Sequence, residues 1–174
     1  HIAVQLARHL GAHVAVTVSD DKKAGLAQGL GAEKIIRYRE QDFIQETLAW
    51  TENKGVDVIF DTVGGEVFLR SFNAARIGGK IISLLSTPLS LADAQLARLR
   101  NLSLSYEFML TPQVMHLHDE RIRQRKILEQ GAQLIEAGKL GVLIHKILPL
   151  KDAAEAHRLM EQGGVTGKIV LAID

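Results

Sequence analysis

Hydrophobic and polar positions follow two rhythms along this chain of 174 residues. Apolar residues at positions 2, 3, 6, 7 and 10 recur at the spacing of one helix face. Elsewhere, short runs rich in β-branched residues are typical of buried parallel strands. The pattern predicts helices over residues 1–10, 21–30, 41–52, 66–75, 91–100, 120–137 and 151–162. It predicts strands over residues 13–18, 33–36, 56–61, 80–85, 102–110, 140–148 and 168–173.

The order of these segments indicates an α/β fold. Strands and helices alternate through the first half of the chain, with glycine at many of the turns. Parallel strands joined by helices need right-handed crossovers that pack back onto the sheet. The sequence therefore predicts a doubly wound parallel sheet with helices on both faces. From Thr87 onward the alternation is looser.

The composition narrows the classes of function. Hydrophobic residues make up 47% of the chain and charged residues 24%, as in ordinary globular proteins. A net charge of +1 with dispersed basic residues gives no reason to expect nucleic acid or a membrane as a partner. No apolar run approaches the roughly 20 residues that cross a bilayer, so we expect a cytoplasmic protein. The absence of cysteine excludes disulfides, thiolate zinc ligands and cysteine nucleophiles.

Candidate binding residues follow the predicted strands. In an open parallel sheet, ligands bind at the carboxyl ends of the strands. The segments at these ends are residues 19–23, 37–38, 62–65 and 84–86. Gly64 and Gly65 would let a ligand approach the backbone closely, because no Cβ intervenes. A plain strand-to-helix turn is the alternative interpretation of this glycine pair.

Other motifs point away from competing chemistries. The dinucleotide fingerprint G-x-G-x-x-G is absent, because the GLG at 29–31 ends a predicted helix instead of starting one. His116 and His118 form a lone H-x-H without a third ligand in view, which favours solvent-exposed side chains over a metal site. The sequence contains no G-x-S-x-G elbow, the motif that would indicate a hydrolase. No side chain stands out as a catalytic acid or base.

Several motifs in a fixed order resemble one enzyme family. The most characteristic is GVDVIFDTVGG at 55–65, and LIEAGKL at 134–140, PLKDA at 149–153 and TGKIVL at 166–171 follow it. Together with segments 1–12 and 25–38, these motifs resemble the zinc-free quinone oxidoreductase (NADPH:quinone reductase) branch of the medium-chain dehydrogenase/reductase family. The resemblance covers almost the whole chain. It implies hydride transfer from NADPH to a quinone, another α,β-unsaturated carbonyl or a small carbonyl substrate.

The resemblance also implies how the chain is organised. It assigns residues 1–150 to a Rossmann-like dinucleotide-binding domain, and residues 151–174 to a helix and strand that return to a substrate domain. It implies that the family's first strand, glycine loop and substrate domain precede His1. The opening helix has neither an initiator methionine nor a capping residue before it. We therefore expect this chain to carry half of a dinucleotide site; the sequence identifies no substrate and does not explain the start at His1.

The same resemblance implies a cofactor site. It places Lys23 and Tyr38 on a ribose 2′-phosphate, with Ser19 nearby. The rest of the cofactor path would be lined, beside Gly64, by Thr62, Val63, Leu84, Leu85 and Ser86. We expect Asp61 to order the turn after its strand and not to take part in catalysis.

The choice between NADP and NAD depends on the end of the first predicted strand. Val18 takes the position where an NAD enzyme usually carries a carboxylate, so we favour NADP and keep NAD as the alternative. Asp20 and Asp21 would repel a phosphate unless they cap the next helix, which we expect them to do. The turn at 162–166 lacks the arginine that the family often has there, and this weakens the preference for NADP.

Two other functions and one partner follow from the same comparison of motifs. A zinc-dependent alcohol dehydrogenase of the same family would take its metal ligands mainly from the domain before His1. A non-catalytic, nucleotide-binding sensory module is favoured slightly by Leu84 and Leu85, where the family often has glycine.

Leucine and aromatic residues alternate with polar ones over 102–110, as in a strand with one covered face. The resemblance implies that this strand pairs with its twin in a homodimer.

Overall fold

The computed structural model describes residues 1–173. The chain forms two compact units. The first unit combines residues 1–35 with the chain from residue 125 onward, and the second comprises residues 36–124. Within residues 1–173 no helix is long and apolar enough to span a membrane.

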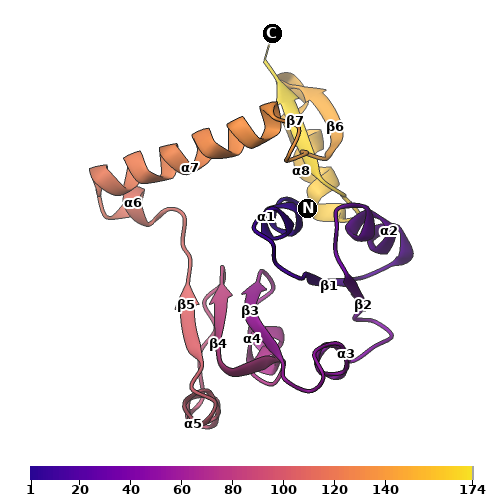
Figure 1. Ribbon diagram of the computed structural model, residues 1–174. Helices are drawn as coiled ribbons and strands as arrows, with labels where there is room; N and C mark the ends of the chain where they lie inside the picture. The colour runs from indigo at the N-terminus through magenta and orange to yellow at the C-terminus, as the bar shows by residue number, and fades with distance from the viewer. Residues whose placement is uncertain (174) are drawn as a thin grey trace. The chain divides into compact units, whose positions relative to one another are not determined.

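The first unit contains short strands and helices from the beginning and the later part of the chain (Figure 1). Its first part contains α1 (Ile2–His9), β1 (Ala15–Val18), α2 (Asp21–Gly29) and β2 (Lys34–Arg37), whose last two residues belong to the second unit. The helix α7 (His118–Glu136) begins in the second unit and ends in the first, where β6 (Ile144–Pro149), η1 (Leu150–Asp152), α8 (Ala153–Gln162) and β7 (Lys168–Ala172) follow it. Strand β1 pairs with β2, and β6 pairs in parallel with β7.

A small apolar cluster packs α2 against β1. Its buried members are Val18, Ala24, Ala27 and Ala32. Three of these four residues are alanines, so helix and strand approach closely, but each residue removes little apolar surface from water. This packing holds the end of β1 against α2, and so it sets the position of the residues that follow Val18.

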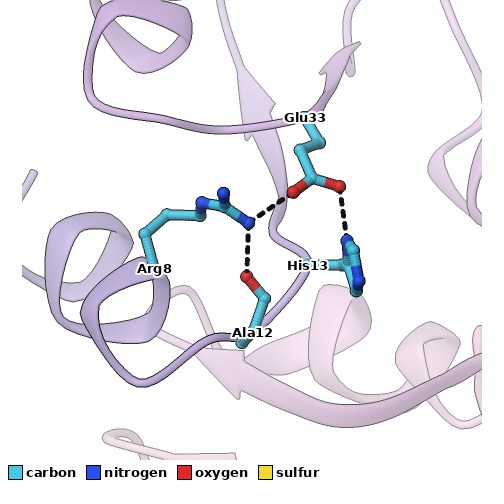
Figure 2. Close-up of polar contacts among 4 residues, drawn as sticks. All are labelled: Arg8, Ala12, His13 and Glu33. Atoms are coloured by element: carbon cyan, nitrogen blue, oxygen red, sulfur yellow. Dashed lines mark hydrogen bonds and ion pairs between the residues drawn. The ribbon is translucent and has the colours of Figure 1, made fainter.

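One carboxylate joins the turns that follow α1 and α2 (Figure 2). Arg8 of α1 donates a hydrogen bond to the Ala12 carbonyl at 2.8 Å and forms an ion pair with Glu33. The other oxygen of the Glu33 carboxylate lies 2.7 Å from Nδ1 of His13. This hydrogen bond from His13, and to a smaller extent the charges of His13 and Arg8, lower the pKa of Glu33 against the opposing effect of desolvation. The cluster therefore connects two turns that are 20 or more residues apart in the sequence.

The second unit is built on a three-stranded parallel sheet, visible side by side in Figure 1 as β3, β4 and β5. Its elements are α3 (Phe43–Trp50), β3 (Val56–Asp61), α4 (Gly65–Ser71), β4 (Ala75–Ser83), α5 (Leu91–Leu99), β5 (Ser103–Tyr106) and α6 (Thr111–Val114). Phe68 and Phe72 of α4 are fully buried and meet edge to face, with ring centroids 5.3 Å apart. With Ile81 of β4 and Ala97 of α5 they form the core beneath this sheet.

The region after α4 differs from its prediction. The helix expected to reach residue 75 ends at Ser71, and Ala75 already begins β4. A Cβ on Gly55 would lie 2.6 Å from the Ala75 carbonyl carbon, so the two backbones are in direct contact there. The pairing of β3 with β4 then shifts between Val56 and Val58, and the glycines at 78–79 lie within this irregular part of β4.

The strand predicted over 102–110 is shorter in the structure, where β5 ends at Tyr106. The chain turns at Phe108, whose carbonyl accepts a hydrogen bond from the Thr111 amide, and α6 follows with proline in its first turn. The α/β class with parallel strand pairing is confirmed. Within residues 1–173 the strands form three separate sheets.

Candidate functional site

A polar cluster follows β1 in the first unit. The Ser19 hydroxyl donates to the Asp20 carboxylate at 2.6 Å, and Nζ of Lys23 donates to the Ser19 oxygen at 2.8 Å. The second oxygen of Asp20 accepts the Lys23 amide at 3.0 Å and so caps the N-terminus of α2. The capping role expected of Asp20 is confirmed.

The electrostatics of this cluster combine one anion and one cation. Hydrogen bonds from the Ser19 hydroxyl and then from the Lys23 amide lower the pKa of Asp20, so its carboxylate is ionised at neutral pH. The ammonium group of Lys23 lies 3.6 Å from that carboxylate, and the two side chains are 39% and 44% exposed. Val18, which is buried, offers no acceptor. The cluster therefore presents a solvated cation whose charge is partly balanced by Asp20.

Tyr38 was predicted to act with Ser19 and Lys23. It follows β2 directly, its side chain is exposed, and it belongs to the second unit, whereas the other two residues belong to the first. The gathering of these three residues around one phosphate therefore stays a prediction.

The loops that follow β3 and β4 in the second unit contain the other six predicted residues. Asp61, at the end of β3, is paired in register with Ser83 at the end of β4, and both are buried. The Ser83 hydroxyl donates to the Asp61 carboxylate at 2.6 Å. The same carboxylate accepts the amides of Val63 and Gly64 at 3.1 Å. Asp61 thus orders the turn, as expected from the sequence.

Thr87 makes a second connection between these loops. Its hydroxyl oxygen accepts the Gly65 amide at 2.9 Å, and its carbonyl accepts the Tyr106 hydroxyl at 3.2 Å. Only 6% of Thr87 is exposed. Neither Ser83 nor Thr87 was predicted from the sequence, because each meets a partner 22 residues away through strand register and not through a local motif.

Gly64 and Gly65 differ in what surrounds them. Gly64 adopts φ 73° and ψ −165°, a conformation that is essentially restricted to glycine. A Cβ there would lie 3.0 Å from the Cβ of Leu85, so the two loops touch at this point. Around Gly65, by contrast, no such contact lies within 4 Å of where a Cβ would be. The packing of the two loops, and not only the approach of a ligand, requires glycine at position 64.

The two loops present a particular chemistry to a ligand. Their amide donors at positions 63, 64, 65, 84 and 85 are used in hydrogen bonds within the unit. The side chains of Val63, Leu84 and Leu85 are 62%, 42% and 46% exposed. This surface suits a flat, uncharged group more than a phosphate, which would need free donors or cations.

Residues 1–173 contain no group of three or more His, Cys, Asp or Glu side chains placed to hold a metal ion. His116 and His118 therefore lack a third ligand of these types in the described part of the chain. The chain also has no cysteine, which removes the thiolate ligands that zinc commonly takes.

Comparison with curated proteins reveals relatives that match nearly the whole chain. A phenolphthiocerol/phthiocerol polyketide synthase of Mycobacterium tuberculosis is 36% identical over 98% of this chain, which spans 8% of that protein. A 2-haloacrylate reductase from Burkholderia sp. is 34% identical over 98% of this chain. The chain spans about half of that reductase, 51%.

Solved structures lead to the same fold. An NAD-dependent alcohol dehydrogenase has a TM-score of 0.79 and 31% identity over 99% of this chain and 47% of its own. The Escherichia coli quinone oxidoreductase complexed with NADPH has a TM-score of 0.79 and 26% identity over 97% and 52%. The family model described as zinc-binding dehydrogenase matches residues 30–171. With its motifs, parallel sheets and relatives in agreement, this chain belongs to the zinc-binding dehydrogenase family, the medium-chain dehydrogenases and reductases.

Proposed function

We propose that the protein carrying this chain is an NADP-dependent reductase, which transfers a hydride to a quinone or another α,β-unsaturated carbonyl compound. The observation that carries the choice of NADP is the hydrogen-bonded pair of Ser19, which directly follows β1 and Val18, and Lys23 in the first turn of α2. A hydroxyl and a cation suit a 2′-phosphate, whereas a 2′-hydroxyl needs the acceptor that Val18 lacks. The quinone oxidoreductase bound to NADPH supports the same choice by analogy.

The residues divide into two roles under this proposal. Lys23 and Ser19 bind the phosphate end of the cofactor, and a contribution of Tyr38 to the same end stays a prediction. The loops after β3 and β4 hold its uncharged end, through the side chains of Val63, Leu84 and Leu85 and the backbone around Thr62, Gly64 and Ser86. NADPH, when bound, supplies the hydride, and the chain supplies orientation and excludes water. We assign no proton donor to this chain.

The substrate class rests on the chemistry in the relatives' names. A 2-haloacrylate is an α,β-unsaturated carboxylate, and a quinone is a conjugated dicarbonyl. In both compounds a carbon conjugated to a carbonyl group can accept a hydride, because the negative charge moves to oxygen. A pocket that orients such a compound against the cofactor would serve either substrate.

Zinc does not enter the proposal. The family's description names this metal, but the residues of this chain do not fit it, because cysteine is absent and residues 1–173 contain no three-ligand group. We therefore derive no step through a metal ion.

The cofactor choice is tested by fluorescence titration of NADPH and NADH into the full-length protein. Lys23→Ala should raise the Kd for NADPH about tenfold, which is the loss of one charge-assisted contact, and leave NADH within about twofold. Lys22→Ala is the matched control, because it removes the neighbouring exposed lysine of the same helix and should change neither affinity. Equal loss for both cofactors would contradict NADP selectivity. If the wild-type protein binds neither cofactor, the oxidoreductase proposal fails.

A nucleotide-binding sensor is the second candidate, favoured by Leu84 and Leu85. These exposed leucines occupy the loop proposed to admit the reactive end of the cofactor. A sensor would bind NADPH without turnover. An absorbance assay of NADPH oxidation with a set of quinones and enones separates the two candidates. Binding without oxidation of NADPH supports the sensor.

We also propose that two copies of the protein associate through β5. This strand lies at the end of the order β3–β4–β5. Tyr106, its last residue, and Phe108 and Met109 just beyond it are more than half exposed. Unpaired strand edges with apolar residues invite pairing with another strand. Sedimentation velocity at micromolar concentration should show a dimer, and Phe108→Asp should shift it toward monomer. A wild-type monomer would contradict this proposal.

A further inference from the structure

Two connections enclose the six residues proposed to line the cofactor path in the second unit. At one end, the Ser83 hydroxyl of β4 donates to the Asp61 carboxylate of β3 at 2.6 Å. At the other end, the Gly65 amide donates to the Thr87 hydroxyl at 2.9 Å. Between these pairs lie residues 62–64 on the first loop and residues 84–86 on the second. The spacing of the two loops is therefore set at both ends by side-chain hydrogen bonds.

The two connections differ in how many bonds support them. Asp61 accepts two backbone amides as well as Ser83, and the sheet itself pairs Asp61 with Ser83. Thr87 lies beyond the end of β4, and its single hydroxyl bond to Gly65 joins the second loop to the start of α4. Its own backbone is held by the Tyr106 hydroxyl, which reaches the Thr87 carbonyl from β5. Thr87 is thus the point where the ends of β4, β5 and α4 are linked.

We propose that Thr87 is a positioning residue, whose buried hydroxyl sets the separation of the loops at 62–64 and 84–86 for cofactor binding. This inference rests on the proposed function. Without the hydroxyl, the Gly65 amide loses its partner, and the loop after β3 can move away from the loop after β4. Displacement of a binding loop by a fraction of an ångström weakens every contact that a bound cofactor makes with it. Thr87 itself contributes no atom to the apolar surface described above, because it is buried.

The chain offers a matched control for this bond. Gly55 donates its amide to the Thr51 hydroxyl, also at 2.9 Å, at the opposite end of β3. Thr51→Val and Thr87→Val both remove a bond between a threonine hydroxyl and a glycine amide from the same unit. Thr51→Val also removes the bond that its hydroxyl donates to the Thr47 carbonyl at 2.8 Å, so it is the more severe change for stability. Thr87→Ser keeps the hydroxyl and removes only a methyl group. A merely structural role for Thr87 would make the two valine variants alike.

The experiment measures the Kd for NADPH by fluorescence, the kcat and KM of turnover, the thermal midpoint and the hydrogen exchange of the Gly65 amide in the full-length protein. Thr87→Val should raise the Kd about five- to tenfold and speed Gly65 exchange by a similar factor, as expected for one hydrogen bond. It should lower kcat while the KM for the substrate stays within about twofold. Thr87→Ser should restore affinity and kcat to within about twofold, and Thr51→Val should lower only the thermal midpoint.

The possible results separate the inference from the proposed function. If wild type binds NADPH and Thr87→Val binds it equally well, the inference is overturned while the proposed function stands. If wild type binds neither NADPH nor NADH, the proposed function fails first and the inference falls with it. Should Thr87→Val not fold, Tyr106→Phe removes the hydroxyl that donates to the Thr87 carbonyl, from a side chain that is about half exposed. That variant should raise the Kd about two- to threefold, and an unchanged Kd would overturn the inference.

Discussion

The cluster after β1 and the pair of loops after β3 and β4 are built in opposite ways. The first joins Ser19, Asp20 and Lys23, which lie within four residues of one another, and the side chains of Asp20 and Lys23 are partly exposed. The second joins partners 22 residues apart, through Asp61, Ser83 and Thr87, each at most 6% exposed. A solvated local cluster contributes little to stability, whereas breaking a buried network leaves donors without partners. The first region can therefore change its ligand preference with little effect on the fold, and the second cannot.

The largest expected effect follows from removing the buried carboxylate. Asp61→Ala leaves the amides of Val63 and Gly64 and the hydroxyl of Ser83 without their acceptor. We expect the free energy of unfolding to fall by about 3–4 kcal/mol, because hydrogen bonds to a charged group are lost and buried donors stay unpaired. Urea unfolding followed by circular dichroism measures this change.

The matched control for that variant lies on the same strand. Asp57 is 79% exposed and pairs with Arg76 at 2.6 Å. Asp57→Ala should lower the free energy of unfolding by less than about 1 kcal/mol, as for other surface ion pairs. Equal losses for the two variants would show that burial does not separate the regions in the way described above.

A smaller effect should distinguish the two neighbouring glycines. Gly64→Ala places a Cβ in a glycine-only conformation and 3.0 Å from Leu85, so we expect a loss of about 2–3 kcal/mol. Gly65→Ala meets no such contact within 4 Å and has φ 55°, so about 1 kcal/mol is expected. Thermal unfolding of the two variants gives the comparison. If Gly65→Ala were the more damaging of the two, the packing of Gly64 against Leu85 would not be what requires glycine at position 64.

Local patterns predicted much of the fold. The strand at 56–61 coincides with β3, and the predicted helices at 21–30 and 91–100 agree with α2 and α5 to within a residue at each end. Each is a short segment whose periodicity and caps lie in its own sequence. The prediction of helix for residues 72–75 was wrong, because their conformation depends on contact between Ala75 and Gly55, 20 residues earlier. Helical periodicity could not reveal that contact.

The predictions for the candidate site also succeeded where the partners are close in the sequence and failed where they are distant. The Asp20 cap and the turn-ordering role of Asp61 were predicted, since their acceptors lie two or three residues from the amides they bind. Ser83 and Thr87 were missed, because nothing near them in the sequence indicates a partner. Aligning the ends of β3 and β4 in register would find Ser83, because it places Ser83 opposite Asp61. Thr87 lies beyond the end of β4, so this alignment would not reveal its partner.

The smallest effect concerns the pH dependence of the exposed cluster. The Ser19 hydroxyl and the Lys23 amide lower the pKa of Asp20 from its ordinary value of 3.8. A carboxyl group with a lowered pKa stabilises the fold above its unfolded pKa, and this contribution is lost as the pH falls through the lower, folded value. Asp20→Asn keeps an acceptor for the Lys23 amide but does not titrate. Urea midpoints measured between about pH 6 and about pH 2.5 should therefore fall further for wild type than for the variant, with the divergence confined to the range below about pH 4. Because the cluster is solvated, the divergence should shrink in high salt. If the urea midpoints of wild type and Asp20→Asn fall in parallel down to the lowest pH, Asp20 contributes no charge-dependent stability. Asp20 and Asp61 would then differ only in the number of hydrogen bonds that each accepts.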